Sequence, residues 1–348
     1  MLTDHVNDRK HSTTVPAIFP AAYGAVRSGA GALARADLGR IIVAGEDRRD
    51  YLQGLLTNDV AALSAGRGCY AAYLTPQGRM IADMYVYELG DAIVMTMPIE
   101  VKDGVLSKLD QFIFSEDVRL GDVTDGFAQR TMLGPRATAV VAAVTAGTDE
   151  ALRALTPDGC VRTSFQGMPA IVMAASDFGA PGLHVLVEQT SAAAFDAAAE
   201  RAGAVPLDAK TADVVRIEGG IPRFHRDMDE QTLPLEAGVE GRAISFTKGC
   251  YVGQEVIIRV MHRGHGRVAK KLVGLVLAGD AAPEPATPIE SDGRDVGAVT
   301  SAALSPALAR PIALGYVQRD FIAPGTGLSI AGQPATVVAL PFVDQPPN

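Results

Sequence analysis

Apolar residues in the first two thirds of the chain follow two spacings, one typical of strands and one typical of helices. The apolar run at 41–45 predicts a buried strand that ends in a turn, and residues 46–56 repeat apolar side chains at helical spacing. A tight turn at 76–78 lies between two further apolar runs and predicts a hairpin. Strands are expected at 70–74, 80–87, 92–97, 169–173 and 183–187, and helices at 100–113, 191–202 and from about 208. Since hairpins join antiparallel strands, this alternation indicates an α+β fold built on mixed antiparallel sheets.

The pattern changes after residue 271. Short strands are predicted at 271–277, 296–301, 312–317 and 334–340. The loops between them are rich in Pro, Gly and Asp, which favour exposed turns. This segment of roughly 75 residues is long enough for an independent unit. We expect it to form a small β-barrel or sandwich.

The composition is that of a globular protein with two or three domains. Of the 348 residues, 48% are hydrophobic and 20% are charged, which is typical of a folded chain. No apolar run approaches the ~20 residues that span a bilayer, and the N-terminus lacks the basic and apolar regions of a signal peptide. We therefore expect no membrane association and a cytoplasmic protein. The net charge of −9 argues against direct nucleic-acid binding.

The chain has three cysteines, and their positions argue against two common roles. Cys69, Cys160 and Cys250 are widely separated, and no two of them have the spacing of metal ligands. We therefore expect neither a metal site nor a disulfide framework. A reducing compartment fits this usage.

Cys250 lies in the octapeptide Lys-Gly-Cys-Tyr-Val-Gly-Gln-Glu at 248–255, between a cation and a tyrosine. Residues 256–261 continue with apolar side chains at helical spacing, and Gly264 is placed to end the helix. Cys250 would then precede a helix N-terminus, where the helix dipole and Lys248 both favour a thiolate and lower the pKa of the thiol. Two alternatives stay open: Cys250 as a small buried apolar residue, and a strand in place of the helix.

The octapeptide resembles the signature of the YgfZ family, folate-binding proteins that support the assembly and repair of iron–sulfur clusters. That family is a branch of the superfamily of glycine-cleavage T-proteins, which are tetrahydrofolate-dependent aminomethyltransferases. The resemblance extends from about residue 37 to about residue 342. It implies a T-protein/YgfZ-like body around a central folate pocket, followed by a C-terminal β-barrel. The expected division is an irregular leader at 1–24, a folate-binding body at 25–265 with two interleaved α+β subdomains split near 128–212, and the barrel at 266–348.

The resemblance also implies site residues. Residues 216–224 are similar to the superfamily's pterin-binding segment, where Glu218 would hold the ring, since one carboxylate can accept two neighbouring N–H groups. Taken alone, the same residues could be a helix end with an exposed Arg/Glu pair. Glu236, further along, is either a brace of its loop or a ligand contact. The expected set is Cys250, Asp83 and Lys248 for catalysis, with Arg216, Glu218, Asp227 and Tyr251 binding tetrahydrofolate or a one-carbon derivative.

The chain departs from the aminomethyltransferase pattern at residues 75–83. Those enzymes carry two consecutive aspartates where this chain has Ala82 and Asp83. A methyl group neither accepts a proton nor stabilises a cation, so the departure argues against classical aminomethyl transfer. Asp83 itself is either a pocket residue or a solvated strand residue. Tryptophan is absent, and ring stacking would fall to one of Tyr70, Tyr73, Tyr85, Phe224 and Tyr251.

The function that the resemblance implies is a tetrahydrofolate-binding accessory protein. Its partners would be a folate and iron–sulfur client enzymes, including radical enzymes that thiolate tRNA. The alternative is a folate-dependent aminomethyltransferase or demethylase. A third interpretation is an RNA-binding module that uses the basic residues between 259 and 271, although a solvated helix end explains those charges as well. The sequence leaves the oligomeric state and the folate derivative open.

Overall fold

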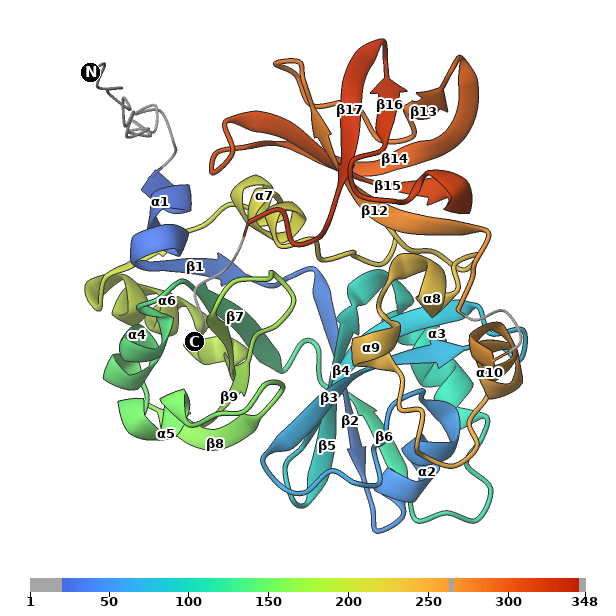
Figure 1. Cartoon of the computed structure of the whole chain (residues 1–348). Coiled ribbons are helices and arrows are strands. Elements are labelled where there is room, and N and C mark those ends of the chain that lie inside the picture. The colour runs from blue at the N-terminus through green and yellow to red at the C-terminus, as the bar shows by residue number, and fades with distance from the viewer. Residues whose placement is uncertain (1–20, 263–265, 344–348) are drawn as a thin grey trace, which may run out of the picture.

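The computed structural model describes residues 21–262 and 266–343. Its helices and strands form three parts that meet near the centre of the molecule (Figure 1). Two α+β subdomains lie side by side in the lower half of that view, and a β-barrel lies above them. The fold is therefore the expected α+β body with a C-terminal barrel.

The first subdomain is a five-stranded antiparallel sheet in the order β3-β4-β5-β2-β6. Its strands are β2 (Leu38–Ala44), β3 (Arg67–Leu74), β4 (Met80–Glu88), β5 (Ala92–Pro98) and β6 (Arg119–Asp122). Two helices, α2 (Arg48–Leu55) and α3 (Ile99–Asp110), bury their apolar faces, including Leu52 and Leu109. The strand predicted at 41–45 and the helix predicted at 46–56 are confirmed.

The second subdomain is a six-stranded sheet in the order β11-β1-β7-β10-β9-β8. Its strands are β1 (Ala30–Ala34), β7 (Phe127–Leu133), β8 (Cys160–Phe165), β9 (Met168–Ala174), β10 (Gly182–Glu188) and β11 (Ala204–Pro206). Its helices are α1 (Ala21–Ser28), α4 (Ala137–Val144), α5 (Asp149–Arg153), α6 (Ala192–Arg201) and the 3₁₀ turn η1 (Gln189–Ser191). Only the β1–β11 pair is parallel within this sheet. Because β1 precedes the first sheet in the chain and the other strands follow it, the two subdomains are interleaved.

The chain then returns to the first subdomain. Helix α7 (Ala209–Glu218) leads to α8 (Pro234–Ala237), α9 (Glu240–Ala243) and α10 (Gln254–His262). Leu235, Ala243 and Ile257 from these last three helices are buried in the same core as the first sheet. The helix expected at 256–261 is confirmed and the alternative strand is wrong. The expected stop at Gly264 lies outside the described residues.

The C-terminal part is a closed barrel in the order β12-β15-β14-β13-β16-β17. Its elements are β12 (Lys270–Leu277), β13 (Pro288–Ser291), β14 (Arg294–Ser305), β15 (Arg310–Gln318), the 3₁₀ turn η2 (Arg319–Phe321), β16 (Gly327–Ile330) and β17 (Gln333–Val338). Leu275, Ile289 and Ile330 lie in its fully buried centre. The alternative of a sandwich is therefore excluded, and two strands, β13 and β16, were not predicted.

The N-terminal segment differs from the sequence expectation. Residues 21–24 were placed in an irregular leader, yet they form the first turn of α1, where Tyr23 and Val26 are buried. Residues 1–20 lie outside the described part of the chain. None of the described helices has the length and apolar character to cross a lipid bilayer.

Candidate functional site

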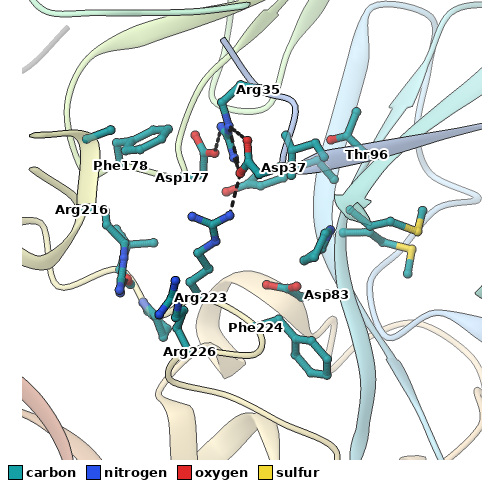
Figure 2. A pocket seen from close by; sticks show the side chains of 18 of the residues that line it. Arg35, Asp37, Asp83, Thr96, Asp177, Phe178, Arg216, Arg223, Phe224 and Arg226 are labelled. Atoms are coloured by element: carbon teal, nitrogen blue, oxygen red, sulfur yellow. Dashed lines mark hydrogen bonds and ion pairs between the residues drawn. The ribbon is translucent and has the colours of Figure 1, made fainter. Parts of the chain in front are cut away.

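A cavity of about 400 Å³ lies between the two subdomains. Its walls come from the β1–β2 connection, from β3 to β5, from the loop before β10 and from α7 with the turn after it. Polar side chains project into it from all of these elements (Figure 2). A cavity of this size with apolar walls and a few converging polar groups is typical of a small-molecule site.

Asp83, a predicted catalytic residue, lines this cavity from β4. The Tyr70 hydroxyl donates a 2.7 Å hydrogen bond to its Oδ2. Burial raises the pKa of Asp83 above its usual range, although the hydrogen bond from Tyr70 opposes the shift. Among the described residues no cation forms an ion pair with Asp83. The carboxyl group is therefore suited to hold or release a proton inside the cavity.

Ala82 does not line the cavity. Its side chain is fully buried in the core of the first subdomain, since successive residues of a strand point to opposite faces. An aspartate at this position would point into that core. The argument drawn from Ala82 against aminomethyl transfer therefore weakens, because the cavity keeps the acid that faces it.

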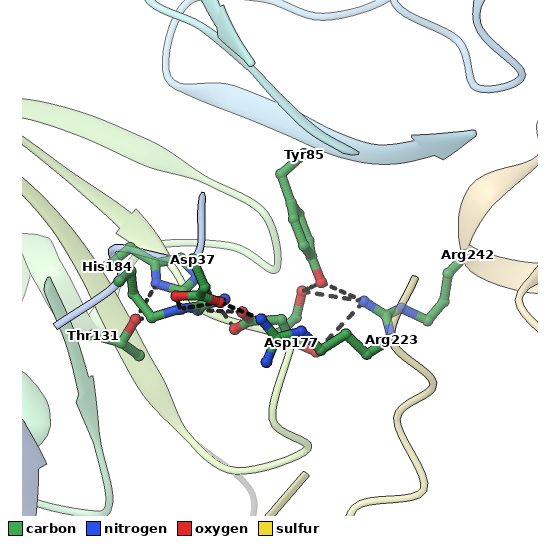
Figure 3. A network of polar contacts seen from close by, with 9 residues as sticks. Asp37, Tyr85, Thr131, Asp177, His184, Arg223 and Arg242 are labelled. Atoms are coloured by element: carbon green, nitrogen blue, oxygen red, sulfur yellow. Dashed lines mark hydrogen bonds and ion pairs between the residues drawn. The ribbon is translucent and has the colours of Figure 1, made fainter. Parts of the chain in front are cut away.

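A network of charged residues lies along the cavity wall (Figure 3). Arg35 donates hydrogen bonds to both oxygens of Asp37, at 3.0 and 3.1 Å, and to Asp177 at 2.5 Å. Arg223 reaches Asp37 from the turn after α7, at 2.7 Å. Burial opposes ionisation of Asp37, but Arg35 and then Arg223 outweigh it and lower the pKa. These side chains tie the two subdomains together at the edge of the cavity.

His184 extends the network into the second sheet. Its Nε2 lies 3.3 Å from Asp177 Oδ1, and its Nδ1 lies 2.8 Å from the Thr131 hydroxyl. Burial opposes ionisation of Asp177, yet Arg35 and His184 hold its pKa below the usual range.

A tight turn at 223–228 carries Arg223 and two further side chains of the cavity wall. The Arg223 carbonyl accepts the backbone N–H groups of Arg226, Asp227 and Met228 at 3.1, 2.7 and 3.2 Å. Asp227 Oδ2 accepts the Arg223 N–H at 3.1 Å and Arg216 Nη1 at 2.5 Å. Asp227 is fully buried and absent from the cavity wall, so it braces the turn that presents Arg223, Phe224 and Arg226.

Glu218 also lies away from the cavity. Its fully buried carboxylate accepts hydrogen bonds from Tyr23 at 2.8 Å and from Ser305 at 2.5 Å, and it forms an ion pair with Arg27. Tyr23 and Arg27 belong to α1 and Ser305 to the barrel. Glu218 therefore joins three parts of the chain. The alternative of an exposed helix-end pair is wrong, because Arg216 and Glu218 are both buried.

The octapeptide lies outside the cavity wall as well. Lys248 Nζ donates to three carbonyl oxygens at the end of α2, those of Gln53, Leu56 and Asn58, at 2.6 to 2.9 Å. Burial lowers the pKa of Lys248 to about 8. Cys250 is exposed, so it is not a buried apolar residue, and it precedes α10 by a short turn.

Aromatic side chains form part of the cavity wall. Tyr70, Tyr85 and Phe224, all named as candidates for ring stacking, line it together with Phe178. Tyr73 and Tyr251 do not. Tyr251 is buried, which raises its pKa to about 12, and its ring lies 5.2 Å from Lys248 Nζ.

Comparison with known proteins agrees with this architecture. Residues 12–248 match the GCVT N-terminal domain, and residues 270–344 match the glycine cleavage T-protein C-terminal barrel domain. The chain belongs to the glycine cleavage T-protein family. An aminomethyltransferase of Streptomyces coelicolor is 31% identical to it over 329 residues, covering 91% of this chain and 87% of that protein. A putative chloroplastic transferase of Arabidopsis thaliana is 28% identical, covering 89% and 71%.

A solved member of the T-protein family has the same fold. The crystal structure of the glycine cleavage system aminomethyltransferase T from Bartonella henselae superposes with a TM-score of 0.83 at 19% sequence identity. The similarity covers 93% of this chain and 89% of that one. These matches establish the T-protein family, whereas the YgfZ branch stays a prediction.

Several residues of the cavity wall were not predicted from the sequence. Arg35, Asp37, Asp177, His184 and Arg226 were not named as site residues. Arg35 and Asp37 stand directly between two strands, which is a common place for binding residues. His184 and Asp177 gave weaker signals, since one is a lone polar residue in an apolar strand and the other lies in a loop. Glu236 proves to be a loop brace, because its carboxylate accepts the Leu233 N–H at 3.2 Å.

Proposed function

We propose that this T-protein family member is a folate-dependent transferase of the aminomethyltransferase type, with the reaction taking place beside Asp83. The observation that carries the proposal is an acid with a raised pKa and no ion-pair partner among the described residues, placed in the central cavity. The curated relatives named above as aminomethyltransferase support the choice of chemistry. Proton transfer by a positioned acid contributes typically about 10² to 10⁴-fold to a rate.

The residues of the cavity fit a reduced folate. Tyr70, Tyr85, Phe178 and Phe224 offer faces for a flat ring system, and charged groups of both signs surround them. Tetrahydrofolate, when bound, supplies a ring nitrogen that carries the one-carbon unit. The cavity volume of about 400 Å³ lies within the range for sites of small ligands.

Each wall of the cavity has a distinct task in this proposal. Asp83 Oδ1 holds or releases a proton, while the Tyr70 hydroxyl fixes the orientation of the carboxyl group through Oδ2. Arg216 lines the cavity and contacts the ligand, whereas Glu218 and Asp227 position the segments that carry it. The predicted ligand contact of Tyr251 is not part of this assignment, because Tyr251 lies outside the cavity wall.

Equilibrium binding and a transfer assay test the proposal. Purified protein should bind tetrahydrofolate and should catalyse tetrahydrofolate-dependent transfer of the methylene carbon of an aminomethyl donor, followed as methylene-tetrahydrofolate and released ammonia. A lower affinity of a cavity variant such as Phe224→Ala for tetrahydrofolate, compared with the wild type, ties the ligand to this site. Absence of tetrahydrofolate binding at millimolar concentration would overturn the proposal.

A second candidate function is support of iron–sulfur clusters in client enzymes, including those that thiolate tRNA. The observation that favours it is the exposed Cys250 thiol on a segment that is anchored by the buried Lys248 and Tyr251. An exposed thiol on a well-anchored segment is accessible to a partner protein, whereas a buried structural cysteine is not.

Complementation separates the two functions. Cells that lack the gene should recover the activity of a cluster enzyme under oxidative stress when they receive the wild-type chain. If the second function holds, Cys250→Ala fails to restore that activity while keeping tetrahydrofolate-dependent transfer. Full rescue by Cys250→Ala would show that this function does not require the thiol.

A further inference from the structure

The charges that line the cavity do not balance. Arg35 and Arg223 are paired with Asp37, and Arg216 is paired with Asp213 and Asp227. Arg226 also lines the cavity, but its side chain has no hydrogen bond or ion pair with any described residue. A guanidinium group is always charged and presents a planar set of donors that suits a carboxylate. Arg226 is therefore an exposed cation at the wall of a ligand-sized space, without a side-chain partner among the described residues.

The backbone at Arg226 is fixed by the hydrogen bonds of a tight turn. It belongs to the turn at 223–228, in which one carbonyl accepts three N–H groups and the buried Asp227 closes the remaining side. His225, the residue before it, has a φ of 60° and points outward to Glu230, at 3.0 Å. The turn therefore directs Phe224 and Arg226 inward and His225 outward. The turn fixes the backbone from which the guanidinium extends, so binding an anion requires no rearrangement of the chain.

The rest of this wall strengthens the positive charge. Arg216, Arg223 and Arg226 gather on the side of the cavity formed by α7 and the turn (Figure 2). Asp83 lies across from them and is held by a neutral hydroxyl. The cavity therefore has one end suited to an anion and another suited to a nitrogen that exchanges a proton.

We propose that Arg226 binds a carboxylate of the ligand and so selects ligands with an anionic group. This inference rests on the proposed function for the identity of the ligand, and it adds the recognition of the ligand's charge. The carboxylate has two possible sources: the glutamate of a folate, or the carboxylate of an amino-acid co-substrate. Arg226 forms a charge-assisted, bidentate contact with it in either case.

Isothermal titration of matched ligands tests this assignment. The probes are tetrahydrofolate, 6-methyltetrahydropterin (which lacks every carboxylate of the folate), p-aminobenzoylglutamate, and glycine added to protein loaded with 6-methyltetrahydropterin. The variants are Arg226→Gln, the charge-conserving Arg226→Lys, and the control Arg294→Gln on the exposed surface of the barrel. Melting curves should be alike for all, because neither arginine has a side-chain partner among the described residues.

If the folate supplies the carboxylate, Arg226→Gln weakens tetrahydrofolate and p-aminobenzoylglutamate about 10- to 100-fold. The affinity of the variant for 6-methyltetrahydropterin then stays within about twofold of the wild type, and Arg226→Lys recovers part of the loss. If the co-substrate supplies it, only the glycine titration weakens. The inference is overturned if Arg226→Gln changes the affinity for no probe, or if it weakens the binding of 6-methyltetrahydropterin as much as that of tetrahydrofolate.

These outcomes keep the inference separate from the proposed function. Folate binding that is insensitive to Arg226 leaves the function standing and removes the inference. A chain that binds p-aminobenzoylglutamate through Arg226 but no pterin-containing probe retains the anion site and loses the proposed function. A chain that binds none of the four probes loses both.

Discussion

The central cavity and the octapeptide at 248–255 both carry chemically active side chains, but they are built in opposite ways. At the cavity, residues far apart in the sequence converge: Asp83 comes from β4, Asp177 from the second subdomain and Arg226 from the turn after α7. In the octapeptide the reactive residues are sequence neighbours that separate in space. Lys248 is buried against α2, whereas Cys250 is exposed.

This difference separates two kinds of functional signal. Some residues of a conspicuous motif can have a structural role. Lys248, for example, donates hydrogen bonds to the carbonyl oxygens at the end of α2. A binding cavity, in contrast, is assembled from residues that are unremarkable one at a time. Four substitutions, two at or behind the cavity and two in the octapeptide, can break or sharpen this comparison.

Replacing the acid of the cavity should have the largest effect. Asp83→Asn removes the carboxyl group that exchanges a proton in the proposed function, and we expect the transfer rate to fall about 100- to 10,000-fold. Tetrahydrofolate affinity should change much less, because asparagine keeps the shape and still accepts a hydrogen bond from Tyr70. Single-turnover kinetics measure the rate, with Asp280→Asn on the barrel surface as the control. A rate within threefold of the wild type contradicts the role given to Asp83.

Glu218 should matter for stability and not for the ligand. Glu218→Gln removes one partner of a buried ion pair with Arg27, and we expect the free energy of unfolding to fall by about 2–3 kcal/mol. Denaturant titration measures the loss, and the exposed Glu284→Gln serves as the matched control. Loss of tetrahydrofolate binding with unchanged stability would instead support the pterin contact predicted from the sequence.

The octapeptide lysine should also act through stability. Lys248→Met removes three hydrogen bonds to the carbonyl oxygens at the end of α2, and we expect a loss of about 1–3 kcal/mol. Hydrogen exchange should show faster opening of the last turn of α2. Lys108→Met, at an exposed position of α3, provides the comparison. Unchanged stability together with slower alkylation of Cys250 would restore the electrostatic role that the sequence suggested for Lys248.

Cys250 should have the smallest effect on the isolated protein. Because its side chain is exposed, Cys250→Ala should change the free energy of unfolding by less than about 0.5 kcal/mol. Tetrahydrofolate binding and transfer should also be unchanged, as titration and single-turnover assays can check. A clear loss of transfer in this variant would place the thiol in the chemistry of the cavity and erase the contrast between the two regions.

The sequence predicts those elements whose own residues carry a strong periodic pattern. Strand β4 and helix α3 are examples, with apolar residues at regular spacing that match the buried positions observed. Strands β1 and β16 were missed, since Ala-Gly-Ala-Leu-Ala and Gly-Leu-Ser-Ile are short and carry little pattern. Their pairing is fixed by distant partners and not by local propensity.

The candidate site follows the same division. Asp83 was found because its segment resembles a known pattern, and its place in the cavity agrees. Glu218 was predicted to bind the ligand. In the structure its carboxylate instead accepts hydrogen bonds from Tyr23 and Ser305, which are 195 and 87 residues away in the sequence, and the residues next to Glu218 do not indicate these contacts. The Asp177–His184 pair and Arg226 depend on the packing of whole subdomains, which a single sequence does not display.

The early position of β1 has a consequence for the order in which the protein can be made. During synthesis the first sheet is complete once β6 has emerged, but β1 must wait for β7, its partner at Gly31–Leu133, and later for β11 at Ala30–Ala204. Arg35 and Asp37 lie in the connection that follows β1, which stays unpaired until its partner strands have been synthesised. The cavity is therefore incomplete in every nascent chain that ends before the second sheet, so such a chain lacks the site proposed for the ligand.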